Sequence, residues 1–276
     1  MTLRPPIFLA SLLGGAIALA ACSASRAQSE PPAQSDASSQ APPAQSQPTQ
    51  APDTLLVGSL ALRGAKLQLG TVTTRGSETD SAGTRPLNVI VQTISREREG
   101  GLGVYLIHSV TASARGDTTV GEIVVRADNL ALVHHRVKGP RDSMAVACAG
   151  DHITGWVVLP NQPTRLINAV VPHPVLPVDG PAPWLLTVLP LADGYATTLR
   201  RFDPWSAAEK PKSLRVLGSE RIEWQGRMIE CWKVEDAPVG IPGYTTLRWV
   251  DKRTRRVVQT ILRGKPGQVE YTGIAD

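Results

Sequence analysis

The stretch TVGEIVVRADNLALVHHRV, from Thr119 to Val137, decides the fold class of this chain. Apolar and polar residues alternate on both sides of Ala127-Asp128-Asn129, and β-branched residues are frequent, which is typical of half-buried strands. Asp and Asn tolerate the left-handed backbone of a tight turn, so this tripeptide suits a hairpin connection. We therefore expect two antiparallel strands, Thr119 to Arg126 and Leu130 to Val137.

The same period of two recurs along most of the chain from residue 54 onward, with turn residues between the runs. The pattern predicts a β-rich domain built from successive antiparallel hairpins. The further expected strands are Leu55 to Leu62, Lys66 to Thr74, Asn88 to Ser95, Val104 to Ala112, Met144 to Cys148, His152 to Leu159, Thr164 to Val170, Val216 to Trp224, Met228 to Val234, Thr245 to Asp251 and Arg256 to Arg263.

One segment, Pro172 to Leu191, breaks this pattern because it contains six prolines, which forbid sheet pairing and interrupt helices. Only a short helix fits, over Pro183 to Leu189, with a proline in its first turn where the missing amide donor is harmless. An apolar helix in a β-rich chain is expected to cover the open side of a curved sheet, either as core or as the lid of a cavity.

The N-terminus has the layout of a secretory signal. Its apolar run, Ile7 to Ala21, is 15 residues long, whereas a membrane-spanning helix needs about 20. The run ends in Leu19-Ala20-Ala21-Cys22, which resembles the lipobox of bacterial lipoproteins. That resemblance implies acylation of Cys22, a mature chain that starts there, and anchoring through acyl chains. Ordinary secretory cleavage that leaves Cys22 unmodified is the alternative.

Composition divides the chain into three parts. Residues 1–21 form the expected lipoprotein signal peptide, residues 22–53 are rich in Ser, Ala, Gln and Pro and are expected to be a disordered tether, and residues 54–276 form one β-rich globular domain. The residue after Cys22 is Ser23 rather than Asp. In diderm bacteria this resembles lipoproteins that are sent on to the outer membrane, so we expect an outer-membrane position facing the periplasm if the host is diderm. The net charge of +5 is modest, and with no reading motif it argues against a nucleic-acid partner.

Beyond Cys22 the chain has two cysteines, Cys148 and Cys231, both in strand-like runs. An even pair in an oxidising compartment is compatible with one disulfide, and equally with two separate core thiols. A metal site is not expected, since the histidines show no ligand spacing with either cysteine. His134 and His135 are adjacent on an expected strand and so point to opposite faces.

Three segments carry a family resemblance: Val124 to Leu132, Gly226 to Val234 and Leu247 to Val258. They resemble an uncharacterised family of exported bacterial proteins whose fold is similar to the periplasmic lipoprotein carrier and receptor proteins. The resemblance extends from about Val104 to Gly264. It implies a strongly curved antiparallel sheet, or half-barrel, around one or two short covering helices.

The concave side of a half-barrel is either filled by side chains or open to an apolar ligand, and strand alternation does not distinguish the two. Trp184, in the expected helix, and Trp205, in a loop-like segment, are the residues we expect to contact a ligand.

The sequence contains no motif that indicates an enzyme: there is no nucleophile elbow, no pair of histidines at metal-binding spacing and no phosphate-binding loop. We therefore expect a non-catalytic, lipid-anchored envelope protein without a cofactor that binds an apolar ligand or an envelope protein. The alternatives are a structural or assembly lipoprotein with a filled core, and an envelope hydrolase whose residues are scattered through the chain.

Overall fold

The computed structural model describes residues 54–57, 59, 62, 67–177, 183–264 and 270–276. The signal peptide, Cys22 and tether expected within residues 1–53 lie outside the described residues. The strands are β1 (Thr54–Leu55), β2 (Gly70–Asp80), β3 (Gly83–Glu99), β4 (Leu102–Ser113), β5 (Thr118–Arg126), β6 (Leu132–Lys138), β7 (Ser143–Ala149), β8 (His152–Val158), β9 (Arg165–Val170), β10 (Ala196–Leu199), β11 (Phe202–Asp203), β12 (Ala208–Glu209), β13 (Lys212–Trp224), β14 (Arg227–Pro238), β15 (Thr245–Asp251), β16 (Val257–Arg263) and β17 (Glu270–Ala275). The helix is α1 (Pro183–Leu186).

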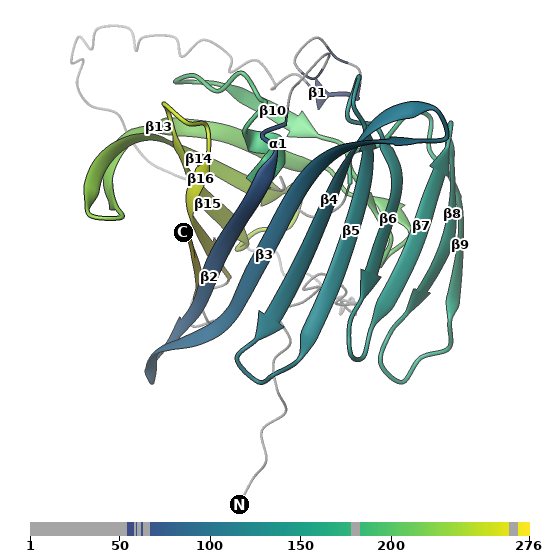
Figure 1. Cartoon of the computed structure of the whole chain (residues 1–276), viewed down its shortest axis with the longest axis horizontal. Coiled ribbons are helices and arrows are strands. Elements are labelled where there is room, and N and C mark those ends of the chain that lie inside the picture. The colour runs from purple at the N-terminus through teal and green to yellow at the C-terminus, as the bar shows by residue number, and fades with distance from the viewer. Residues whose placement is uncertain (1–53, 58, 60–61, 63–66, 178–182, 265–269) are drawn as a thin grey trace, which may run out of the picture. The chain divides into compact units, whose positions relative to one another are not determined.

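Fifteen of the described strands form one sheet, in the order β1-β10-β13-β14-β15-β16-β17-β2-β3-β4-β5-β6-β7-β8-β9. All neighbours are antiparallel except β1 and β10, and β11 pairs with β12 separately. The sheet bends so that β2 to β9 lie on one side of α1 and β13 to β16 on the other (Figure 1). It does not close, because β1 and β9 are its two edges. The prediction of a mainly β chain with a curved antiparallel sheet and a short helix is confirmed.

The hairpin from Thr119 to Val137 forms as β5 and β6, with one difference at the turn. The left-handed residue is Leu130, at φ 62°, rather than Asp128 or Asn129. The Asn129 side chain instead accepts a hydrogen bond from the Ala131 amide at 2.9 Å. This local side-chain bond replaces a backbone pair, so β6 begins at Leu132, two residues later than expected.

The expected elements before β3 were wrong in extent. Of the described residues in the run from Leu55 to Leu62, only Leu55 lies in a strand, as the second residue of β1. Beyond it, the Ser59 amide donates to the Leu56 carbonyl at 3.0 Å in a turn. The next strand starts at Gly70 and continues to Asp80, because a long β2–β3 hairpin extends beyond the apolar residues. Alternation also missed β10, β11, β12 and β17, and the helix ends at Leu186 rather than at Leu189.

The concave face of β4 to β9 is lined by one continuous row of paired residues. The members are directly opposite one another in the register, and those with side chains are buried: Ile107, Ile123, His135, Val146, Gly155 and Ile167. Because side chains alternate between faces, a row of this kind forms the floor on which the covering segments pack. At Gly155 the Ala145 carbonyl lies 2.0 Å from where a Cβ would stand, so this pair of strands approaches too closely for any other residue.

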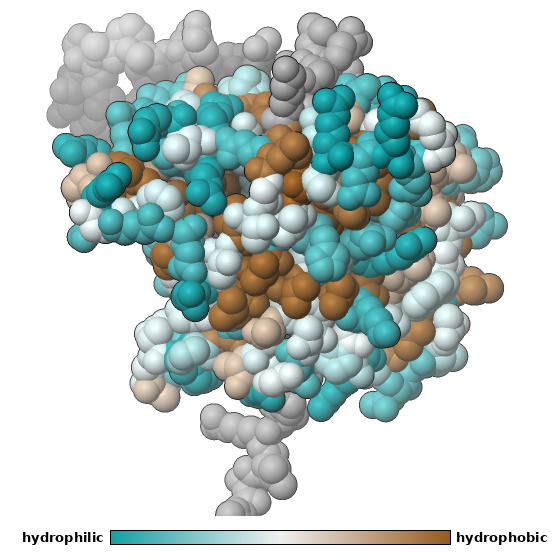
Figure 2. All heavy atoms as spheres, in the orientation of Figure 1, coloured by the Kyte–Doolittle hydropathy of each residue, from teal (hydrophilic) through white to brown (hydrophobic). Residues whose placement is uncertain are grey.

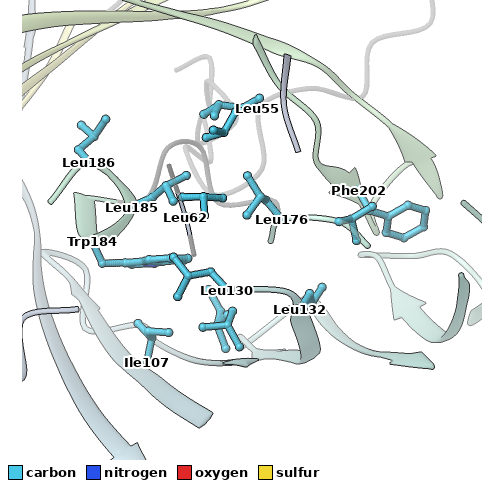
Figure 3. Close-up of a cluster of buried hydrophobic side chains, with 14 of the residues drawn as sticks. Leu55, Leu62, Ile107, Leu130, Leu132, Leu176, Trp184, Leu185, Leu186 and Phe202 are labelled. Carbon is cyan, nitrogen blue, oxygen red and sulfur yellow. The ribbon is translucent and has the colours of Figure 1, made fainter. Parts of the chain in front are cut away.

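Segments from outside the sheet fill this half of the concavity. Trp184, Leu185 and Leu186 of α1 belong to one buried cluster with Leu62 and Ile107. Figure 3 shows the Trp184 ring pointing into this cluster, with Ile107 on one side and Leu62 and Leu185 on the other. Burying aliphatic and aromatic side chains at about 1.5 to 3 kcal/mol each is the main source of stability here.

The face of the molecule shown in Figure 2 mixes apolar side chains, gathered near the middle, with polar ones around them. Among the residues that the structure describes, no helix combines the length and the apolar character needed to cross a membrane.

Candidate functional site

A cavity of about 250 Å³ lies on the concave face of the sheet beside α1. Its floor comes from β2, β3, β16 and β17, and its cover from Pro183, Trp184 and Thr187. The cavity therefore occupies the part of the concavity that lies away from the filled half over β4 to β9. Side chains thus fill the part of the concave side over β4 to β9, whereas the part over β2, β3, β16 and β17 keeps a cavity.

The cavity exists because the floor residues here are small. A second row of directly paired residues crosses the sheet from β14 to β3: Val234, Arg248, Thr260, Gly273, Gly76 and Asn88. The next row pairs Ala275 with Thr74 and Thr74 with Ile90. Isoleucine and valine dominate the row beneath the filled half, whereas glycine, alanine and threonine prevail here. Side chains of this size leave the space that α1 bridges.

Tyr271 fills part of this floor by lying across the two glycines. A Cβ on Gly76 would stand 2.6 Å from the Tyr271 ring and 2.2 Å from the Asn88 side-chain oxygen. A Cβ on Gly273 would stand 3.0 Å from the Tyr271 hydroxyl. Burial raises the pKa of Tyr271, and the nearby Arg248 charge partly opposes this shift. The phenol is therefore neutral at physiological pH and forms a flat wall of the cavity.

The walls are apolar with a few amides and hydroxyls. Val72, Ile90, Ile94 and Val257 supply aliphatic surface, and Gln68, Gln92 and Gln259 supply amides. Ligand sites are typically clefts of about 300 to 1,000 Å³, mostly apolar, with a few polar groups that fix orientation. This cavity lies just below that range, so it suits a small apolar molecule or a single hydrocarbon chain.

The charged residues lining the cavity are Arg248 and Arg256, and none of its described lining residues is acidic. Arg248 is buried and pairs through its Nη1 with Asp236, which is 1% exposed. Lys212 Nζ donates to the other carboxylate oxygen of Asp236 at 2.7 Å. Burial lowers the pKa of Lys212, while the Asp236 charge opposes that shift. Two buried cations therefore share one buried carboxylate beside the cavity.

Two buried donors of the cavity residues have no hydrogen-bond partner among the described residues. They are the Nε of Arg248 and the Nε1 of Trp184. Buried polar groups are nearly always paired in folded proteins, so an unpaired donor calls for an explanation. Both donors need an acceptor, which the surrounding side chains described by the structure do not supply.

Of the two tryptophans expected to contact a ligand, the structure brings one to the cavity. Trp184 is 3% exposed and lines it. Trp205 packs against the main core cluster instead. Its backbone amide donates to Asp203 at 3.0 Å, and its carbonyl accepts from Arg165. Trp205 therefore holds the loop after β11 in place, away from the cavity.

The two cysteines are both free thiols, so the disulfide alternative is not the arrangement found. Cys148 lies on β7 against the main cluster, whereas Cys231 lies on β14 in a separate cluster with Leu247, Trp249 and Val258. The sheet order places eight strands between β7 and β14, too far for a bridge. Burial raises the pKa of Cys148 to about 11 and, together with nearby carboxylates, that of Cys231 to about 12.

The turn between β15 and β16, residues 252–256, is rich in Lys and Arg. Part of its positive charge is used in contacts within the fold. Arg255 stacks on Trp232 with 4.8 Å from its guanidinium carbon to the ring centroid, and it donates to the Leu189 carbonyl. Lys252 pairs with Glu230 at 2.6 Å. The turn thus ties the segment after α1 to the sheet and helps to hold the cover over the cavity.

The adjacent histidines lie on opposite faces of β6, as expected. His135 is 1% exposed in the concave row, while His134 Nε2 lies 3.3 Å from Glu99 on the other face. In the described part of the chain, no three His, Cys, Asp or Glu side chains converge as a metal site would require.

Sequence reasoning missed Arg248, Asp236, Lys212 and Tyr271. Arg248 itself was the available signal. In the strand Thr245–Asp251 it lies on the same face as Thr246 and Val250, so alternation places a positive charge on a face that the curved sheet buries. Tyr271 gave no signal, because no strand was expected after Arg263.

A family model described as "Protein of unknown function (DUF3108)" matches residues 83–268, which includes the span from Val104 to Gly264 that carries the resemblance. No curated protein sequence matches the chain significantly.

Three solved structures are similar at low identity. A candidate exported protein with a YmcC-like fold from Bacteroides fragilis is 12% identical, with 78% of this chain and 97% of that chain covered and a TM-score of 0.38. A candidate lipoprotein from Parabacteroides distasonis is 11% identical, with 78% and 97% covered and a TM-score of 0.34. A β-barrel-like protein of the DUF1849 domain from Brucella abortus is 11% identical, with 76% and 98% covered and a TM-score of 0.45.

Proposed function

We propose a binding function for this chain, which belongs to the DUF3108 family of proteins of unknown function. The cavity beside α1 takes a small apolar molecule or one hydrocarbon chain of a larger one. The protein binds this ligand on the exported side of a membrane, to which acyl chains on Cys22 anchor it. It has no catalytic activity. The cavity of about 250 Å³ with a mainly apolar wall is the observation that carries this proposal.

The way the cavity is formed supports a binding role over a packing defect. Protein interiors are close-packed, and a void in a core costs stability roughly in proportion to its volume. Here a floor of small residues coincides with a cover that is fixed from outside by Arg255 on Trp232 and Leu189. A cover held apart from its floor keeps the space open for an occupant.

Anchoring is supported by the sequence. The apolar run from Ile7 ends in Leu19-Ala20-Ala21-Cys22, which places a thiol where a lipoprotein leader is processed. Residues 22–53 would then separate the lipid from the domain. Replacing Cys22 by Ser and labelling with a radioactive fatty acid tests this part: loss of label supports the anchor, and unchanged label contradicts it.

The binding claim is tested on the acyl-free mature chain, residues 22–276 with Cys22→Ser, exported behind a cleavable secretory leader and purified without detergent. Organic extracts are analysed by mass spectrometry for the parent and two variants. Thr74→Phe places a ring in the cavity. Thr73→Phe is the matched control, because the neighbouring residue of the same strand points to the opposite face.

A stoichiometric apolar molecule in the parent and in Thr73→Phe, lost in Thr74→Phe, is the expected result. Extracts that are empty in all three proteins would contradict the proposal and favour the alternative of a structural lipoprotein. Equal amounts in Thr73→Phe and Thr74→Phe would place the ligand elsewhere and overturn the assignment to this cavity.

A further inference from the structure

This inference rests on the proposed binding function and concerns the charge around the cavity, which is positive. Its charged lining residues are Arg248 and Arg256, and the described lining holds no carboxylate to match them. Behind the wall, Asp236 already receives a bond from Arg248 and a second from Lys212. Two cations on one carboxylate leave one positive charge in excess next to a mainly apolar space.

Burying that excess charge is unfavourable unless something compensates for it. An isolated charge in an apolar surrounding costs many kcal/mol, and proteins avoid this by pairing or neutralising the group. Lys212 shows the strain: burial lowers its pKa, and the neighbouring charges of Arg201 and Arg248 push in the same direction. The guanidinium of Arg248 carries a delocalised positive charge that an anion can match.

The unpaired donors show where compensation is missing. Arg248 uses Nη1 for Asp236, but its Nε is buried without a partner in the part of the chain that the structure describes. The Nε1 of Trp184 is in the same condition on the covering side of the cavity. A guanidinium binds carboxylate and phosphate oxygens through charge-assisted hydrogen bonds, which are about twice as strong as neutral ones.

We propose that the ligand of this cavity is a single-chain anionic amphiphile, whose hydrocarbon chain lies between α1 and the β2–β3 floor and whose carboxylate or phosphate headgroup accepts from Arg248. Arg248 supplies the donor and the charge. The small volume excludes a ligand with two chains inside the cavity. Arg256 is half-buried in the same lining and is the competing position for the headgroup.

The test is a titration of the acyl-free mature chain, stripped of endogenous ligand by solvent extraction and refolding and checked by circular dichroism. The probes share a ten-carbon chain and differ in the headgroup: decanoate, decyl phosphate, decanol and decyltrimethylammonium. Tryptophan fluorescence reports binding because Trp184 lines the cavity. A charged hydrogen bond predicts that the two anions bind about tenfold or more tightly than decanol, and the cation most weakly.

Three variants assign the headgroup. Arg248→Gln should remove the preference for the anions and keep decanol binding, while Arg256→Gln should keep the preference. Arg263→Gln is the matched control, since Arg263 is on β16 but pairs with Glu270 at the surface at 2.8 Å. If Arg248→Gln does not fold, the order of the four probes on the parent protein decides the proposal alone.

The outcomes separate this inference from the binding function on which it rests. Equal affinity for decanoate and decanol would overturn the anionic headgroup and leave the apolar binding function standing. Loss of the preference in Arg256→Gln but not in Arg248→Gln would also overturn it. Failure of all four probes to bind would contradict the binding function itself.

Discussion

Replacing Asp236 by Ala should destabilise the protein severely, because this carboxylate holds two buried cations. Asp236 is 1% exposed, with Lys212 Nζ at 2.7 Å and Arg248 on its other oxygen. Breaking a buried ion pair by removing one partner costs about 3 to 5 kcal/mol, since the remaining charge is left uncompensated. With total stabilities of about 5 to 15 kcal/mol, this is a large fraction of the whole.

The adjacent residue offers a matched control. Glu235 pairs with Arg215, whose side chain is 61% exposed, and exposed pairs contribute about 0 to 1 kcal/mol. Urea unfolding followed by tryptophan fluorescence measures both variants. At an m value of about 2 kcal/mol/M, a loss of 4 kcal/mol lowers the midpoint by about 2 M. Midpoints that fall equally little in Asp236→Ala and Glu235→Ala would refute the buried charge cluster.

The pH dependence of Asp236→Ala gives an independent check through Lys212. Burial lowers the pKa of Lys212 in the folded state below its ordinary value of 10.5. Between the folded-state pKa and 10.5 the unfolded chain therefore binds more protons than the folded one, and stability rises with pH. Without Asp236 the opposing charge is gone and the pKa falls further, which widens the window. Part of the lost stability should return as the pH rises towards 10.5; a deficit that stays constant contradicts this.

Three other predictions concern the thiols, a close strand contact and the sheet edge. Cys148 and Cys231 should resist alkylation in the native protein at pH 8 and react as two free thiols after unfolding without reductant, because burial raises their pKa values to about 11 and about 12; mass spectrometry counts the labels, and none after unfolding would mean a disulfide. Gly155→Ala should cost about 2 kcal/mol or more in urea unfolding, since its Cβ would stand 2.0 Å from the Ala145 carbonyl; an unchanged midpoint would be inconsistent with that approach. Leu166→Lys should reduce self-association in light scattering at unchanged stability, because Leu166 is 79% exposed on the edge strand β9; unaltered scattering would show that this edge does not associate.

Alternation predicted the fold class because most strands have one buried face. β4 to β9, β15 and β16 were expected in nearly their observed places, and β13 and β14 over more than half of their length, because apolar and polar residues alternate along them. The parts that were missed have weak or misleading patterns. β17 places Tyr271, Gly273 and Ala275 on one face, and two of these three residues are too small to give an apolar stripe, although all three line the cavity.

The candidate site could be predicted only in part. Trp184 was expected at the cavity because an amphipathic aromatic in a covering helix is placed by its local sequence. The ion cluster could not be predicted, since Lys212, Asp236 and Arg248 come from three strands and meet only through the register of β13, β14 and β15. The position of Trp205 away from the cavity could not be predicted for the same reason, because its contact with Arg165 joins residues 40 positions apart.

The most direct test of a ligand cavity is a crystal structure of the acyl-free mature chain, purified without detergent and without solvent extraction. We predict continuous electron density for an apolar chain between Trp184 and the β2–β3 floor, with an acceptor atom at Arg248. An empty cavity, or α1 collapsed onto Thr74 and Ala275 with no space between them, would contradict it.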